Sequence, residues 1–208
     1  MHKPLFVTGI GTGVGKTIVS AILTEQLKAD YWKPVQAGDL RFTDRDTVES
    51  LITNTQTVFH PETYQFKMAA SPHQAARAEQ VVIQKQAFCK PLTANRLIIE
   101  GAGGLMVPLS ADLRMIDLIG QFEAEAILVV RNYLGCINHT LLSMDALFSR
   151  NIPLRAVVFN GAMNEDTASI LVNYFPAATV FVPVPEFTTL NKSSILACPE
   201  LLLTPTIY

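Results

Sequence analysis

The segment Thr8–Thr17 reads TGIGTGVGKT, and it decides the fold that we expect for the rest of the chain. A short apolar run, Leu5–Thr8, leads into it, and an amphipathic stretch, Lys16–Lys28, follows it. Four glycines within seven residues free the backbone to wrap an anion with its N–H groups. A helix that starts directly afterwards points its N-terminus at the same anion. The order of strand, glycine-rich loop, Lys-Thr and helix therefore predicts a phosphate-binding loop.

This loop departs from the strict pattern G-x4-G-K-[ST], because Ile10 stands where the first glycine should be. Gly9 lies one residue further from Gly15, which gives G-x5-G-K-T, and the pattern GxGxxG is not met either. In such a loop Lys16 reaches the β- and γ-phosphates, and the Thr17 hydroxyl ligates Mg²⁺. The alternative is a glycine-rich turn that contains Lys-Thr by chance. This alternative is disfavoured because the strand, the loop, Gly-Lys-Thr and the helix occur together in the expected order.

Short apolar runs alternate with longer amphipathic stretches along the chain. We expect strands at about Leu5–Thr8, Tyr31–Pro34, Leu97–Glu100, Ala126–Arg131, Leu154–Asn160 and Thr179–Val182. We expect helices at Lys16–Lys28, Asn138–Arg150 and Asp166–Phe175, with shorter ones at Thr47–Ile52, His73–Ala78 and Met115–Phe122. Continuously apolar strands between helices are typical of a parallel sheet that is covered on both faces. The pattern predicts an α/β fold of the P-loop NTPase type: three layers, with a mostly parallel central sheet flanked by helices. We expect a single domain over residues 1–208, with an irregular tail from Val182.

Composition excludes several classes of function. Of the 208 residues 49% are hydrophobic and the net charge is −2, so a large core is expected and binding to nucleic acid has no electrostatic support. The apolar runs are too short to span a bilayer, and the N-terminus reaches glycine too early for a signal peptide. Three cysteines without a CxxC motif argue against a disulfide framework and a zinc site. These features predict a soluble cytoplasmic protein that does not bind membranes.

Charged residues end two of the predicted strands, at the edge where such sheets bind ligands. Lys33 enters a loop after the second strand, where it can offer a second cation, although a surface lysine is an equally ordinary reading. Glu100 closes the third strand, where nucleotide-hydrolysing folds place their second Mg²⁺ contact. Asp46 precedes a predicted helix, and a helix cap and a metal ligand are equally good readings of it.

Two further strand ends carry candidate binding groups. Gly135–Asn138 begin a helix after the fourth strand, and their N–H groups would suit a carboxylate. Within them Cys136 is more typical of a small buried side chain than of a nucleophile. Asn160 ends the fifth strand, where its amide could read an adenine edge or simply form a turn.

Taken in order, these segments resemble the dethiobiotin synthetase family. The matching stretches are Thr8-Gly9, Val14–Thr17, Lys33–Val35 with Gly38, Asp46, Ser71–His73, Glu100–Gly104, Leu134–His139 and Asn160. The resemblance implies an ATP-dependent cyclo-ligase that joins CO₂ to the two vicinal amines of 7,8-diaminononanoate. The products are dethiobiotin, ADP and phosphate, and the family works as a homodimer with Mg²⁺.

The resemblance also implies roles for individual residues. Lys33, Lys16 and Thr12 are the expected catalytic residues, and Thr17, Asp46 and Glu100 the expected Mg²⁺ ligands. The nucleotide is expected to contact Gly13, Val14, Gly15, Lys16, Thr17, Ile18, Asp46, Glu100, Gly101, Ala102, Gly103, Asn160, Gly161, Val184, Pro185 and Glu186. The diamine is expected to contact Lys33, Ala37, Gly135, Cys136, Ile137 and Asn138, the last four across a dimer interface.

Three positions depart from the family pattern. Gly13 stands where the family often has an acid, and Ala37 where it often has a serine. Tyr133 replaces a lysine found in some members, with Arg131 as the nearest substitute. The alternative function is an ATPase switch of the partitioning and cell-division class, but Gly11 stands in place of its signature lysine. A fragment of a cobyrinate-type amide ligase would need a glutaminase domain, for which the chain leaves no room.

Overall fold

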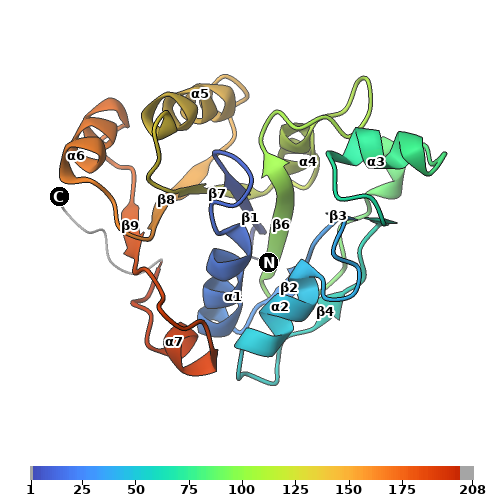
Figure 1. The fold of residues 1–208 in the computed structure, drawn as a ribbon, viewed down its shortest axis with the longest axis horizontal. Helices are drawn as coiled ribbons and strands as arrows, with labels where there is room; N and C mark the ends of the chain where they lie inside the picture. Colours follow the sequence, from blue (N-terminus) through green and yellow to red (C-terminus); the bar gives the residue numbers. More distant parts are fainter. Residues whose placement is uncertain (1, 202–208) are drawn as a thin grey trace.

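A computed structural model describes residues 2–201, and its centre is a seven-stranded sheet. The strand order is β4-β2-β6-β1-β7-β8-β9, and every pairing is parallel (Figure 1). The bounds are β1 Leu5–Gly9, β2 Asp30–Trp32, β4 Phe59–His60, β6 Leu97–Gly104, β7 Glu125–Val130, β8 Leu154–Asn160 and β9 Phe181–Val184. The strand that leads into the glycine-rich loop is thus central, with β6 and β7 on either side. The predicted α/β fold with a mostly parallel sheet is confirmed.

Helices cover both faces of the sheet. The bounds are α1 Lys16–Leu27, α2 Asp44–Leu51, α3 Pro72–Ala78, α4 Met115–Gln121, α5 Cys136–Phe148, α6 Glu165–Tyr174 and α7 Lys192–Leu196. Figure 1 shows α1, α2 and α7 on one face and α4 and α5 on the other, with α6 beside α5. The strands are apolar on both sides because each face packs against a helical layer. In β2, for example, Tyr31 and Trp32 alternate between the two halves of the core.

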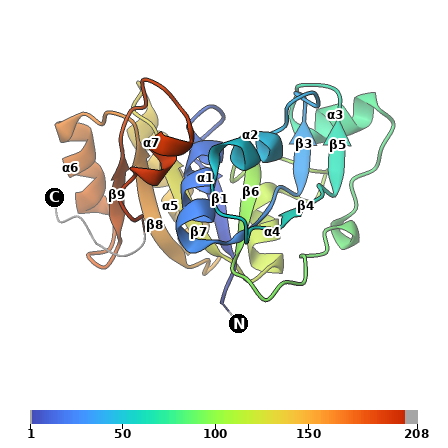
Figure 2. The ribbon, with the colours of Figure 1, turned by 90° about the horizontal axis from the view of Figure 1, so that it is seen from below.

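Several elements were not predicted from the sequence. A second sheet pairs β3 (Val35–Ala37) with β5 (Tyr64–Phe66), and Figure 2 shows it beside α3. A short 3₁₀ turn, η1, covers Lys85–Ala87. Strands of two or three residues are too short to show a period of two, which is why the pattern missed them.

The predicted irregular tail is wrong in part. Its first residues belong to β9, and α7 packs against α1 with Ile195 fully buried. The last part of this prediction, residues 202–208, lies outside the described residues. None of the helices within residues 2–201 combines the length and the apolar character that crossing a membrane requires.

Candidate active site

The glycine-rich loop joins β1 to α1 at the carboxyl end of the central strand. Gly13 and Gly15 have φ angles of 74° and 95°, which favour glycine, and a Cβ at Gly15 would collide with Asn160. The Lys16 Nζ donates to the Gly11 carbonyl at 2.9 Å, so the side chain bends back over the loop. Burial lowers the pKa of Lys16 to about 8, although Glu100 acts in the opposite direction. The loop therefore presents backbone N–H groups and a partly desolvated cation at one place.

A cluster of charged side chains lies beside this loop, at the ends of three other segments. The Thr17 Oγ1 lies 2.8 Å from Glu100 Oε1 and 3.1 Å from Asp44 Oδ1. The Lys33 Nζ donates to Asp44 at 2.7 Å and to Glu100 at 3.1 Å. Thr17 is the second residue of α1, Asp44 starts α2, Glu100 lies in β6, and Lys33 follows β2. The parallel topology thus brings Lys33 and Glu100 to Thr17. Lys33 follows a strand as predicted, whereas Glu100 lies inside β6, which continues to Gly104 beyond the predicted strand end.

The charges in this cluster support one another. Burial would lower the pKa of Lys33, but the carboxylates of Glu100 and Asp44 outweigh burial and raise it. Burial would likewise raise the pKa of Asp44, but the Lys33 ammonium outweighs it and lowers that pKa. Lys33 and Glu100 are both almost inaccessible to solvent, whereas Asp44 is partly exposed. The Lys33 ammonium and the Asp44 carboxylate are therefore each stabilised in their charged form.

The structure does not bring Asp46 to this cluster, which corrects the predicted position of the second acid. Asp46 accepts from the Thr43 backbone N–H at 2.8 Å, and its own N–H donates to the Thr43 hydroxyl at 3.2 Å. This capping box starts α2 and engages the Asp46 carboxylate with Thr43 rather than with Thr17. Asp44, two residues earlier, is the acid beside Thr17. The sequence pattern T-x-x-D at residues 43–46 could have indicated this arrangement, because it is typical of a capping box that engages Asp46.

Replacing each of these acids by its amide should separate their roles. If Mg²⁺ binds beside Thr17, Asp44→Asn should raise the Mg²⁺ concentration needed for half-saturation at least about tenfold, since loss of a group that only orients a metal ligand already lowers metal affinity about 10- to 100-fold. Asp46→Asn is the matched control, because it makes the same chemical change on the same helix. It should weaken the cap of α2 and leave the Mg²⁺ titration unchanged. Metal titrations of both variants, with thermal unfolding as the second readout, check this. Overlaid titration curves for Asp44→Asn and the parent would contradict it.

The predicted base contacts also meet at one edge of the site. Asn160 is buried and its Nδ2 donates to the Val14 carbonyl at 2.8 Å, so it braces the loop. The Gly161 N–H donates to Val184, and Glu186 lies against Gly161 while pairing with Arg131 at 2.7 Å. Pro185 lies between Val184 and Glu186 in sequence. These residues from β8 and β9 border the loop on the side away from Glu100.

The predicted carboxylate site lies at the start of α5. Gly135 has φ 104° and precedes the first helical residue, Cys136, which is buried. Beside it, a pocket of about 460 Å³ is lined by residues of the glycine-rich loop, the segment after β6 and α5. Thr12 lines this pocket, and a Cβ at Gly103 would come 3.7 Å from the Thr12 hydroxyl. Ala37, at the end of β3, is partly buried.

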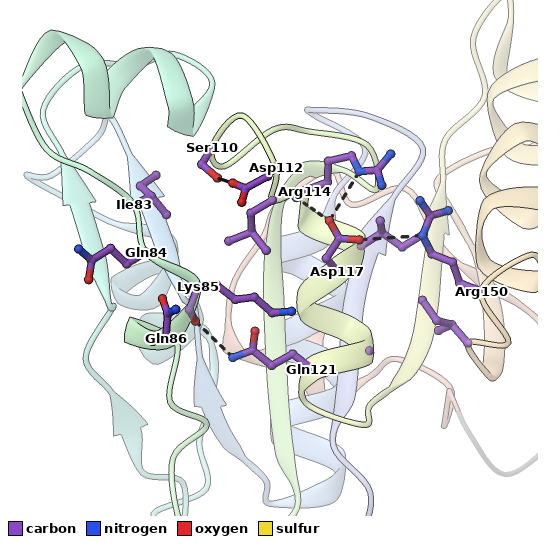
Figure 3. A pocket seen from close by; sticks show the side chains of 14 residues that line it. Ile83, Gln84, Lys85, Gln86, Ser110, Asp112, Arg114, Asp117, Gln121 and Arg150 are labelled. Atoms are coloured by element: carbon purple, nitrogen blue, oxygen red, sulfur yellow. Dashed lines mark hydrogen bonds and ion pairs between the residues drawn. The ribbon is translucent and has the colours of Figure 1, made fainter.

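A larger pocket, of about 760 Å³, lies apart from this cluster, around α4 and the end of α5 (Figure 3). Within the part of the chain that the structure describes, no predicted site residue lines it. Three of its charged groups pair, since Asp117 lies 3.6 Å from Arg114 and 4.0 Å from Arg150. This pocket is larger than the one beside α5, but it is not the candidate active site.

A glycine-rich loop between the central strand and a helix, with a Thr, two acids and a second lysine beside it, defines a P-loop nucleotide-binding protein. A family model described as an AAA domain matches residues 3–194. A plasmid partition protein of Borrelia burgdorferi, solved with AMPPNP, superposes with a TM-score of 0.56 at 13% identity, covering 94% of this chain and 97% of its own. A nucleotide-binding protein of Archaeoglobus fulgidus, solved with ADP, gives 0.52 at 13% identity, covering 93% and 86%. At this identity the likeness shows the fold alone.

Much closer relatives are ATP-dependent dethiobiotin synthetases. The enzyme of Cytophaga hutchinsonii is 52% identical over 83% of this chain and 84% of its own length. The enzyme of Christiangramia forsetii is 48% identical over 82% of each chain. The enzyme of Paramagnetospirillum magneticum is 37% identical over 95% of each chain. This chain therefore belongs to the dethiobiotin synthetase family.

Proposed function

We propose that this chain is an ATP-dependent ligase that joins CO₂ to 7,8-diaminononanoate and closes the ureido ring of dethiobiotin, releasing ADP and phosphate. Membership of the family supports this activity. The structural observation that best supports this activity is the buried Lys33. Its ammonium lies between Asp44 and Glu100, beside Thr17 of the glycine-rich loop. The plasmid partition protein of Borrelia burgdorferi shares only the fold, at 13% identity, so it gives the switch function no comparable support.

We further propose that Mg²⁺ binds among Thr17, Asp44 and Glu100. Their oxygens are the hard donors that Mg²⁺ prefers, and the Lys33 ammonium already lies between the two carboxylates, so a cation suits this place. Bound there with ATP, Mg²⁺ would neutralise charge on the β- and γ-phosphates. Asp44 takes the role that the sequence prediction gave to Asp46.

The chain's own residues then position and stabilise the reacting groups. One neutral amine adds to CO₂ and loses a proton, which gives a carbamate. A carbamate oxygen attacks the γ-phosphorus and ADP leaves, and the second amine then attacks the carbonyl of the mixed anhydride and expels phosphate. The loop N–H groups, Lys16 and Lys33 supply positive charge where negative charge develops, and no protein nucleophile is needed. We place the adenine against Asn160, Gly161 and the residues 184–186, and the diamine near Thr12 and Ala37.

ATP turnover tests this proposal against the alternative. The synthetase should release phosphate only when diaminononanoate and bicarbonate are both present. A nucleotide switch should hydrolyse ATP slowly and without regard to either. Turnover that is unaffected by omitting the diamine would exclude the proposed reaction.

We also propose a homodimer in which the start of α5 reaches the neighbour's active site. The diamine and the carboxylate of the substrate lie on the order of 10 Å apart when the chain is extended at backbone-like bond lengths. Exposed apolar side chains surround the start of α5, namely Leu134, Ile137, Leu142 and, from the segment after β6, Met106. Such a patch beside a helix N-terminus suits a two-fold partner that covers it. We expect residues 1–208 to act as one domain in the cytoplasm.

Mixed dimers of two inactive variants test the shared site. Lys33→Ala disables the amine end, and Asn138→Trp blocks the exposed start of α5. Each alone should be nearly inactive, whereas a purified mixed dimer should keep one intact composite site and recover up to about half of the parent rate, because one of two sites is whole. No recovery in a verified mixed dimer whose subunits bind ATP would show that the carboxylate site is not shared.

A further inference from the structure

Tyr31 is a fully buried polar side chain to which the proposed reaction gives no role. It lies in β2 beside Ile98 of β6 and Phe59 of β4, and its ring packs on Phe59 with centroids 5.8 Å apart. Its hydroxyl donates to Glu100 Oε2 at 2.9 Å. Tyr31 also stands two residues before Lys33, so the period of a strand directs both side chains to the same face.

The two oxygens of Glu100 consequently have different partners. Oε2 accepts from Tyr31, while Oε1 accepts from Thr17 at 2.8 Å and from Lys33 at 3.1 Å. The terminal torsion of a glutamate is soft, so nothing in its own covalent structure fixes which oxygen faces the loop. The buried Tyr31 hydroxyl therefore fixes the plane of the Glu100 carboxylate through Oε2. Oε1 then faces the glycine-rich loop.

We propose that Tyr31 is a positioning residue that orients Glu100 through Oε2, so that Oε1 alone faces Thr17, Lys33 and the metal-bound nucleotide. This inference rests on the proposed Mg²⁺ and nucleotide site and adds a residue to it. Carboxylates that bind metals depend on such hydrogen bonds from neighbouring groups, and loss of one typically lowers metal affinity about 10- to 100-fold.

The test is the gain in ADP affinity that Mg²⁺ provides, measured by calorimetric titration with and without the metal. Tyr31→Phe keeps the ring on Phe59 and removes only the hydroxyl. Its affinity for ADP without Mg²⁺ should match the parent, while the gain on adding Mg²⁺ should fall roughly tenfold. Tyr64→Phe is the matched control, because it removes a phenol oxygen that accepts from the Gln84 N–H outside this cluster.

A double-mutant cycle shows whether Tyr31 acts through Glu100. In a Glu100→Gln background, adding Tyr31→Phe should change the Mg²⁺ gain little, because the oriented carboxylate is already gone. The proposal would be overturned if Mg²⁺ raised the ADP affinity of Tyr31→Phe as much as that of the parent. It would also be overturned if Tyr31→Phe lost ADP affinity equally with and without Mg²⁺. An undiminished effect in the Glu100→Gln background would overturn it as well. These titrations need neither diamine nor turnover, so their outcome is independent of whether the chain makes dethiobiotin.

Discussion

Lys16→Ala is expected to lower kcat about a hundred- to a thousandfold, or about 3–4 kcal/mol, which is typical for one lost charge contact to a transition state. The Lys16 side chain bends over the glycine-rich loop, which is where we propose that the transferring phosphoryl group gains charge. The free energy of unfolding should not fall in parallel. Burial lowers the pKa of Lys16 to about 8, so the folded protein holds this charge less readily than the unfolded chain does at neutral pH.

Steady-state kinetics and thermal unfolding measure both parts of this prediction. Lys192→Ala, which removes an exposed lysine at the start of α7, is the matched control and should leave both quantities near the parent values. A Lys16→Ala enzyme that keeps most of its kcat would refute the assignment of residues 8–17 as the catalytic phosphate-binding loop.

Lys33→Ala is expected to lower kcat at least as much as Lys16→Ala does. Unlike Lys16→Ala, it should also lower the free energy of unfolding. The pKa of Lys33 is raised in the folded protein, so its charge stabilises the fold at neutral pH, and this contribution is lost only as the pH rises through the folded pKa. Removing it leaves the Asp44 and Glu100 carboxylates facing each other without a cation. The loss of stability should be substantial, because Lys33 and Glu100 form a buried pair and Glu100 would be left without its cation, whereas the partly exposed Asp44 adds less to the loss.

Mg²⁺ provides the second readout for Lys33→Ala. If the carboxylates of Asp44 and Glu100 form a cation site, the metal should restore part of the lost stability in this variant and much less in the parent. Thermal unfolding with and without Mg²⁺ measures the difference. A variant that is as stable as the parent without metal would contradict the charge balance described for this cluster.

Most of the candidate site could be predicted because parallel strands place their carboxyl ends at one edge. Lys33, Glu100 and Asn160 each follow or end a strongly apolar run, so their approach to the glycine-rich loop followed from topology alone. The contact between Tyr31 and Glu100 joins two side chains of the sheet that are 69 positions apart in the sequence. No local sequence pattern could therefore predict it.

Asp46 was expected to be either a helix cap or a metal ligand, and Asp44 was not among the candidates. The structure shows Asp46 in the cap and Asp44 beside Thr17, although both acids lie in the first turn of α2. The start of α2 at Asp44, earlier than predicted, places Asp46 in the cap. Boundaries of short helices depend on tertiary contacts, so the error arose where helix signals are weakest.

The most direct test of the account is the product itself, formed by the purified chain from diaminononanoate, ATP, Mg²⁺ and ¹³C-labelled bicarbonate. Mass spectrometry should detect dethiobiotin that carries the labelled carbon, in step with ADP release, and Lys16→Ala should form almost none. Release of ADP without labelled dethiobiotin, in a preparation that binds ATP, would contradict the proposed function.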